Sequence, residues 1–208
     1  MNVLIGCEFS GVVREAFRRR GHNAWSCDLE PAEDGSPYHL QCNVMYVLNP
    51  GPDNTYYRGP TWDLLIAHPP CTYLCNSGVR WLYEGGKGTV RNHDRWEALM
   101  RATWLFEALM GRGNNPIRRI AVENPIMHRH AAELINRPPD QIIQPWQFGH
   151  PETKATCLWL RNLPPLQPTN IVEGRIGRVH HESPGPDRWK RRSRTYTGIA
   201  EAMAEQWG

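Results

Sequence analysis

Three side chains that can take part in chemistry each follow a short apolar segment. One apolar run leads into the turn His-Pro-Pro-Cys71, a second leads into Glu123, and a third leads into Asp28. A thiolate is nucleophilic near neutral pH and leaves readily, and a carboxylic acid can protonate or hydrogen-bond a ring nitrogen. If a cysteine and a glutamate lie side by side, the cysteine sulfur could therefore add to C6 of a pyrimidine ring while the glutamate acts on the ring nitrogen. This addition activates the C5 carbon for methylation.

The start of the chain predicts the elements that position Asp28. Residues 2–6 form a short apolar strand, residues 10–20 form an amphipathic helix with Ser10 as its N-cap, and residues 23–27 form a second strand ending at Asp28. A strand, turn, helix and strand followed by an acid is the arrangement of a nucleotide-type cofactor site. We therefore expect a cofactor near Asp28.

The rest of the chain alternates between strand and helix patterns. Strands are predicted at 62–67, 117–122, 142–146 and 156–160, helices at 93–111 and 197–207, and long irregular segments at 49–61, 72–93 and 161–192. This alternation favours an α/β fold with a mainly parallel sheet and helices on both faces. Ligands of such sheets bind at the carboxyl ends of the strands, where we expect Asp28, Cys71 and Glu123 to lie.

Composition and cysteine spacing limit the class of protein. The 208 residues are 40% hydrophobic and 22% charged, which suits one soluble domain with a small appendage. No apolar run approaches the length of a membrane span. The six cysteines form no Cys-x-x-Cys pair. We therefore expect reduced thiols in a cytoplasm, and neither a metal site nor a membrane partner.

Positive charge is concentrated near the end of the chain. The formal net charge is only +3, but Lys190, Arg191, Arg192 and Arg194 are clustered in a segment rich in Pro and Gly. Such a cluster suits a polyanion or a solvated helix face. Phosphate contact by this cluster is one of the two readings that its composition leaves open.

The order of the motifs resembles that of the DNA cytosine-5 methyltransferases. The segment from Asp63 to Cys71, followed by Asn76-Ser-Gly-Val-Arg80, resembles the family's proline-cysteine nucleophile motif, and Val122-Glu-Asn124 resembles its glutamate-asparagine-valine motif. The resemblance implies the Rossmann-like fold of S-adenosylmethionine-dependent methyltransferases. It also implies that Cys71 is the nucleophile, that Glu123 engages the ring nitrogen, and that Ser77 and Arg80 contact nucleic acid.

Other segments carry the resemblance to the cofactor site. Phe9-Ser-Gly11 resembles the family's glycine-rich turn, although Glu8 and Ser10 stand where the family has glycines, and Cys42-Asn-Val44 resembles its Gly-Asp-hydrophobic motif. The residues implied in S-adenosylmethionine binding are Phe9, Ser10, Gly11, Asp28, Asn43 and Pro69.

The last third of the chain departs most from the family. Phe148-Gly-His-Pro151 with Lys154 resembles an aromatic-Gly-x-Pro-Gln-x-Arg motif, which implies that Lys154 acts in catalysis in place of an arginine. Residues 161–195 stand where the family carries a large target-recognition region. We expect them to form a short clamp on DNA phosphates. The cations proposed for this clamp are His180, His181, Lys190, Arg191, Arg192 and Arg194.

The resemblance implies a compact, phage-like DNA cytosine-5 methyltransferase that acts as a monomer in the cytoplasm of a bacterial or phage-infected cell. Residues 1–160 are expected to form the catalytic core, 161–195 a substrate-binding segment, and 196–208 a helix that packs back on the core. The glycine-rich loop 72–93 would serve as a lid over a flipped cytosine. Two alternatives remain: the same chemistry on single-stranded nucleic acid or a free nucleotide, and a nucleic-acid-binding protein on a degenerate methyltransferase scaffold.

Overall fold

The computed structural model describes residues 1–49, 59–86, 89–112, 115–179 and 181–208. The strands are β1 (Asn2–Gly6), β2 (Asn23–Asp28), β3 (His39–Gln41), β4 (Leu64–Ala67), β5 (Arg119–Pro125), β6 (Gln141–Ile143) and β7 (Thr156–Arg161). The α-helices are α1 (Val12–Arg19), α2 (Val44–Leu48), α3 (Asn76–Val79), α4 (His93–Leu109), α5 (Arg129–Ile135), α6 (Arg188–Ser193) and α7 (Thr197–Trp207). Short 3-10 helices are η1 (Arg80–Leu82), η2 (Glu84–Gly86) and η3 (Pro145–Gln147).

Within these residues the strands form one seven-stranded sheet in the order β3-β2-β1-β4-β5-β7-β6. Neighbouring strands are parallel from β3 through β5, whereas β7 runs antiparallel to both β5 and β6. The order reverses direction between β1 and β4, and this reversal opens a crevice at the carboxyl ends of the strands. The prediction of a mainly parallel α/β sheet is confirmed.

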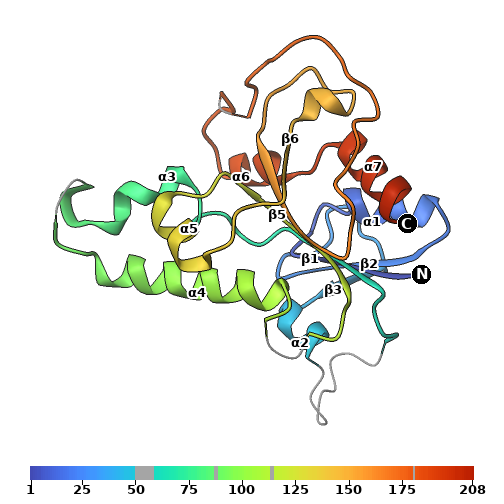
Figure 1. Ribbon diagram of the computed structural model, residues 1–208, viewed down its shortest axis with the longest axis horizontal. Helices are drawn as coiled ribbons and strands as arrows, with labels where there is room; N and C mark the ends of the chain where they lie inside the picture. The colour runs from blue at the N-terminus through green and yellow to red at the C-terminus, as the bar shows by residue number, and fades with distance from the viewer. Residues whose placement is uncertain (50–58, 87–88, 113–114, 180) are drawn as a thin grey trace.

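Helices cover both faces of the sheet, as predicted (Figure 1). On one face, Val3 and Ile5 of β1 pack in the same core as Phe17 of α1 and the buried side of α7. On the other face, Leu4 packs in a second core with α2 and with Phe106 of α4. Successive residues of a strand point to opposite faces, so the unbroken apolar run of β1 supplies both cores.

The last helix is held against the first. α7 packs on α1, and the Trp207 side chain is fully buried, with its Nε1 donating to the carbonyl oxygen of Pro164 at 2.9 Å. Arg119 at the start of β5 donates to the carbonyl oxygen of Trp207 at 2.5 Å. The division of the chain into core, substrate segment and closing helix stays a prediction.

Several predicted elements differ from the structure. Ser10 is not the N-cap of α1, because Gly11 holds that position without a side-chain hydrogen bond. The strand predicted at 142–146 ends at Ile143, and a 3-10 helix begins at Pro145, whose ring removes a backbone donor from any further ladder.

Short elements were also missed. β3, α2, α5 and α6 were not expected, and the segment 72–93 contains α3, η1 and η2 where a mobile loop was predicted. These pieces are too short to show a clear periodicity in sequence. Of the segment 49–61, predicted as a loop, positions 50–58 lie outside the described residues.

The described helices include none that is long and apolar enough to cross a membrane. All six cysteines carry free thiols.

Candidate active site

The turn after β4 holds Cys71 at the carboxyl edge of the sheet. The backbone amides of Leu74 and Cys75 both donate to the carbonyl oxygen of Cys71 at 3.0 Å. From the neighbouring strand β5, Asn124 Nδ2 donates to the carbonyl oxygen of Pro69 at 3.0 Å. The turn is therefore fixed from both sides, and the Cys71 side chain remains partly exposed.

Glu123 forms a pair with His68, a residue that the sequence did not single out. In the parallel register Ala67 lies opposite Val122, so the next residue of each strand is brought to the same edge. His68 Nδ1 lies 2.9 Å from Glu123 Oε2, and the two side chains are only 10% and 13% exposed. An ionised carboxylate can only accept, so the imidazole donates.

The charge state of Glu123 follows from this pairing. Burial by itself would raise the pKa of the carboxyl, but the hydrogen bond from His68, the charge of His68 and the charge of Lys154 outweigh burial, so the pKa is lowered. The other imidazole nitrogen, His68 Nε2, is buried and has no hydrogen-bond partner among the described residues. A polar atom that is buried without a partner is costly, and it marks this corner as a place for substrate or water.

Cys71 shares a hydrogen bond with a second thiol, Cys75. This bond, together with burial, raises the pKa of Cys71, whereas the same bond and those from Ser77 lower the pKa of Cys75. Cys75 Sγ lies 3.0 Å from Ser77 Oγ. Of the two thiols, Cys75 therefore ionises first, and the proton stays on Cys71.

Gly78 lets the chain fold closely behind Cys71. A Cβ atom at this position would collide with the backbone oxygen of Thr72, so the Ser-Gly motif has a steric cause. The neighbouring Ser77 and Arg80 are exposed, which leaves both side chains accessible. Their predicted contact with nucleic acid stays a prediction.

Lys154 reaches the same edge from the segment before β7. The positive charge of Lys154 favours the ionised forms of both Cys71 and Glu123. On each group this effect is smaller than those of burial and hydrogen bonding. Lys154 Nζ donates to the carbonyl oxygen of Arg194 at 3.3 Å. The structure thus brings together Cys71, Glu123 and Lys154, the three residues predicted for catalysis, and their catalytic roles stay predictions.

The turn between β1 and α1 is organised by Glu8. This buried carboxylate accepts from the backbone amides of Val13 at 2.7 Å and Arg14 at 3.2 Å, so it occupies the N-terminus of α1. Gly11 has φ of +72°, and a Cβ there would collide with the guanidinium of Arg14. The amides that a glycine-rich turn would offer to an anion are therefore already bonded within the chain.

The other residues predicted for the cofactor are distributed along the same edge. Asp28 ends β2, is partly exposed, and accepts from the backbone amide of Glu30 at 3.0 Å. Asn43 is exposed and caps α2 by accepting from the amide of Met45 at 3.0 Å. Pro69 is buried in the Cys71 turn. Asp28 keeps carboxylate surface for ribose hydroxyls, whereas the oxygen of Asn43 is used by the helix.

The basic segment around α6 packs on the turn that follows β1. Trp189 lies 5.5 Å from the Phe9 ring between centroids, and Phe9 is only 7% exposed. Lys190 pairs with Glu30 at 3.4 Å. Segments far apart in sequence thus meet near the predicted cofactor site, and α6 covers the aromatic ring predicted to contact the cofactor.

Two of the remaining cations of this segment are paired with acids. Arg194 pairs with Glu33, Arg191 pairs with Glu182 at 2.5 Å, and Arg192 has a buried Nε without a partner among the described residues. His181 is exposed, and His180 lies outside the described residues. The predicted role of this segment in nucleic-acid binding stays a prediction.

The strand order, with its single antiparallel strand, defines the Rossmann-like fold of S-adenosylmethionine-dependent methyltransferases. Among solved structures the chain is similar to a protein assigned as a DNA modification methyltransferase of an E. coli prophage, with a TM-score of 0.51 and 15% identity over 88% of this chain and 55% of that one.

Two further structures are less similar. The Entamoeba histolytica methyltransferase EhMeth has a TM-score of 0.45 and 14% identity over 89% of this chain and 60% of that chain. The S. pombe Dnmt2 methyltransferase has a TM-score of 0.38 and 16% identity over 87% of this chain and 54% of that chain. The chain spans between 54% and 60% of the length of these three proteins, and the likeness to the first supports the fold alone. No protein-family model and no curated protein sequence matches the chain.

Proposed function

We propose that this protein transfers a methyl group from S-adenosylmethionine to C5 of cytosine in DNA, with Cys71 as the nucleophile. One observation carries the proposal: in a methyltransferase fold, Cys71 and the Glu123–His68 pair lie at the carboxyl ends of adjacent strands. Pyrimidine activation needs a nucleophile for C6 and a hydrogen-bonding acid for N3. Cys71 meets the first need, and Glu123 meets the second once its carboxylate has taken up a proton.

Each residue then has a defined task. Cys71 passes its proton to a water molecule or another base, and its sulfur adds to C6 while the electron pair moves toward N3. Glu123 engages N3 and the adjacent amino group, and His68 holds its carboxyl in place. After methylation at C5, a base removes the C5 proton and the C6–S bond breaks, which restores the Cys71 thiolate and the aromatic ring.

S-adenosylmethionine, when bound, supplies the electrophilic methyl group. The adenosine half fits the carboxyl edge, because Asp28 offers a partly exposed carboxylate for ribose hydroxyls at the end of β2. The amino-acid half has to be held without the first amides of α1, which Glu8 already occupies.

The occupied α1 N-terminus favours one second candidate function, a nucleic-acid-binding protein that does not catalyse methyl transfer. Titration calorimetry with S-adenosylmethionine separates the two. Heat of binding is expected for the enzyme, and binding of DNA without binding of the cofactor would favour the second candidate.

The main proposal is tested with DNA that contains 5-fluorocytosine. Because fluorine at C5 cannot be lost as a proton, the sulfur adduct should persist and shift the protein band on a denaturing gel when S-adenosylmethionine is present. Ordinary DNA should yield 5-methylcytosine by mass spectrometry of its nucleosides. Cys71→Ala should abolish both, and Cys42→Ala, which removes a different thiol, should abolish neither. Methylation by the Cys71→Ala variant would refute the role of Cys71.

A further inference from the structure

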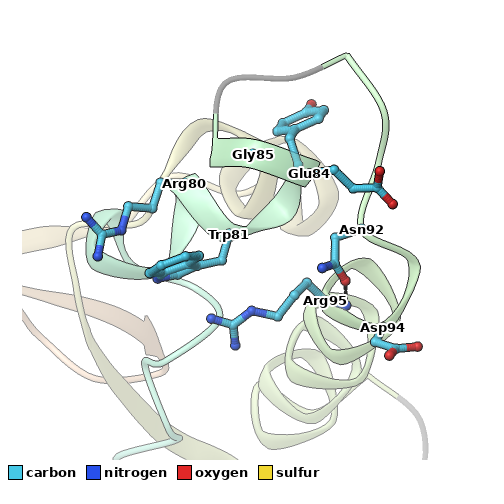
Figure 2. Close-up of a pocket in the computed structure, with 8 residues that line it drawn as sticks. Arg80, Trp81, Glu84, Gly85, Asn92, Asp94 and Arg95 are labelled. Carbon is cyan, nitrogen blue, oxygen red and sulfur yellow. Dashed lines mark hydrogen bonds between the residues drawn. The ribbon is translucent and has the colours of Figure 1, made fainter.

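A cavity of about 650 Å³ lies between the segment after α3 and the start of α4. Its lining residues are Arg80, Trp81, Tyr83, Glu84, Gly85, Asn92, Asp94 and Arg95. Figure 2 shows the side chains of Arg80, Trp81 and Arg95 projecting to one side, and the carboxylates of Glu84 and Asp94 on the other. The cavity therefore combines an aromatic ring, two guanidinium groups and two carboxylates.

The aromatic ring is presented to solvent in a fixed position. Trp81 is 48% exposed, and the Arg80 guanidinium stacks over its ring at 4.3 Å from the ring centroid. A tryptophan backed by an arginine is a platform on which a flat ring can stack.

The cavity is connected to the turn that carries the nucleophile. The Arg95 guanidinium lies 5.1 Å from the ring of Tyr73, two residues after Cys71. The backbone of Arg95 is fixed in turn, because its amide donates to Asn92 Oδ1 at 3.2 Å in the cap of α4. Arg95 therefore joins the cavity to the segment that follows Cys71.

We propose that this cavity binds an unpaired nucleotide next to the target cytosine, so that the substrate is a single-stranded nucleic acid. The base would stack on Trp81, the phosphate would meet Arg80 and Arg95, and the carboxylates would accept hydrogen bonds from the exocyclic amino groups of the base. The identity of the target base rests on the proposed function, but the stacking site does not.

Two features favour a single strand over a duplex. In a duplex the faces of each base are covered by its neighbours, so a protein ring can stack only on a base that has left the helix. Duplex binding also depends on many cations facing phosphates. Lys190, Arg191 and Arg194, the most basic part of the chain, are instead paired with acids of the same chain.

Fluorescence anisotropy of labelled twelve-nucleotide strands tests this site. Single-stranded DNA, single-stranded RNA and the matching DNA duplex are titrated with the unmodified protein and with Trp81→Ala, Trp81→Phe and Arg80→Gln. Trp104→Ala is the matched control, because Trp104 is 61% exposed on α4 and lines a different cavity. Loss of one stacked base should weaken single-strand binding on the order of 5- to 150-fold in Trp81→Ala.

The supporting result is a loss in Trp81→Ala and Arg80→Gln, with Trp81→Phe and Trp104→Ala close to the unmodified protein and the duplex unaffected. The strand that loses affinity, DNA or RNA, identifies the sugar. Equal single-strand affinity of Trp81→Ala and the unmodified protein would overturn the proposal, as would an equal loss for the duplex.

The same experiment separates this proposal from the proposed function, because binding requires no methyl transfer. Single-strand binding that depends on Trp81, with no 5-methylcytosine formed on any substrate, would overturn the proposed function and leave this site standing. Methylation of duplex DNA that is unchanged in Trp81→Ala would overturn this site and leave the proposed function standing.

Discussion

Replacing His68 by alanine should leave the carboxylate of Glu123 buried without its hydrogen-bond partner. The 2.9 Å bond joins side chains that are 10% and 13% exposed, so water screens the pair weakly. Removing the donor of a hydrogen bond to a buried charged group costs about 1.5–3 kcal/mol. Because the charge of Lys154 still reaches Glu123, we expect a loss of about 2 kcal/mol in the free energy of unfolding at pH 7.

The pH dependence of this loss follows from the direction of the Glu123 pKa shift. In the unmodified protein that pKa lies below its ordinary value of 4.5, so the pair adds stability above pH 4.5 that is lost as the pH falls through the folded pKa. In His68→Ala burial dominates and raises the pKa above 4.5, so the stability of the variant should fall as the pH rises from 4.5. The slope is at most about 1.4 kcal/mol per pH unit.

Urea unfolding of both proteins between pH 4 and pH 8, followed by tryptophan fluorescence, measures this difference. The gap in unfolding free energy should be largest near neutral pH and should shrink below pH 4.5. His68→Asn is the matched control, because its amide nitrogen can take the place of Nδ1 and donate to Glu123, so it should recover much of the loss. A gap that is absent at pH 7, or that is unchanged at pH 4, would refute the pairing as described.

Two further predictions concern groups that the sequence did not identify. At pH 7 Cys75 should react with iodoacetamide faster than Cys71, because its lowered pKa gives more thiolate. Peptide mass spectrometry measures the alkylation rates of both thiols. Equal rates would contradict the shared hydrogen bond. Glu8→Ala should lower the free energy of unfolding by about 1–2 kcal/mol, because α1 loses its cap. Glu8→Gln keeps an acceptor oxygen and should cost less than half as much in urea unfolding, whereas an equal cost would indicate that the charge, and not the cap, stabilises the helix.

The sequence was sufficient to predict the elements whose hydrophobic pattern is long or uninterrupted. The apolar runs of β1, β2, β4 and β7 and the helices α4 and α7 were found close to their observed positions, because burial imposes a periodicity that can be detected along the chain. The Pro-Pro-Cys turn after β4 could be predicted in the same way, because an apolar run that ends in two prolines indicates a turn. These features were enough to indicate an α/β fold and to single out Cys71 as a candidate nucleophile.

Contacts between distant segments could not be predicted in the same way. Sequence context made His68 an ordinary histidine, and only the register of β4 with β5 places it beside Glu123, 55 residues away. Glu8 was seen as a departure from a glycine-rich turn, yet its carboxylate caps the helix that the turn leads into. Trp81 carried no motif, and it becomes a platform only because η1 packs beside the start of α4.

The sequence by itself thus determined the fold class, the Cys71 turn and the acid on the neighbouring strand, because each depends on the order of apolar and polar residues within one segment. The tertiary structure decided which groups surround Cys71: the imidazole on Glu123, the second thiol, and the lysine from the segment before β7. It also decided where the basic α6 lies, against the Phe9 turn. The physical reason is that pKa values, ion pairs and cavities depend on distances through space, which strand register and helix packing set and local pattern does not.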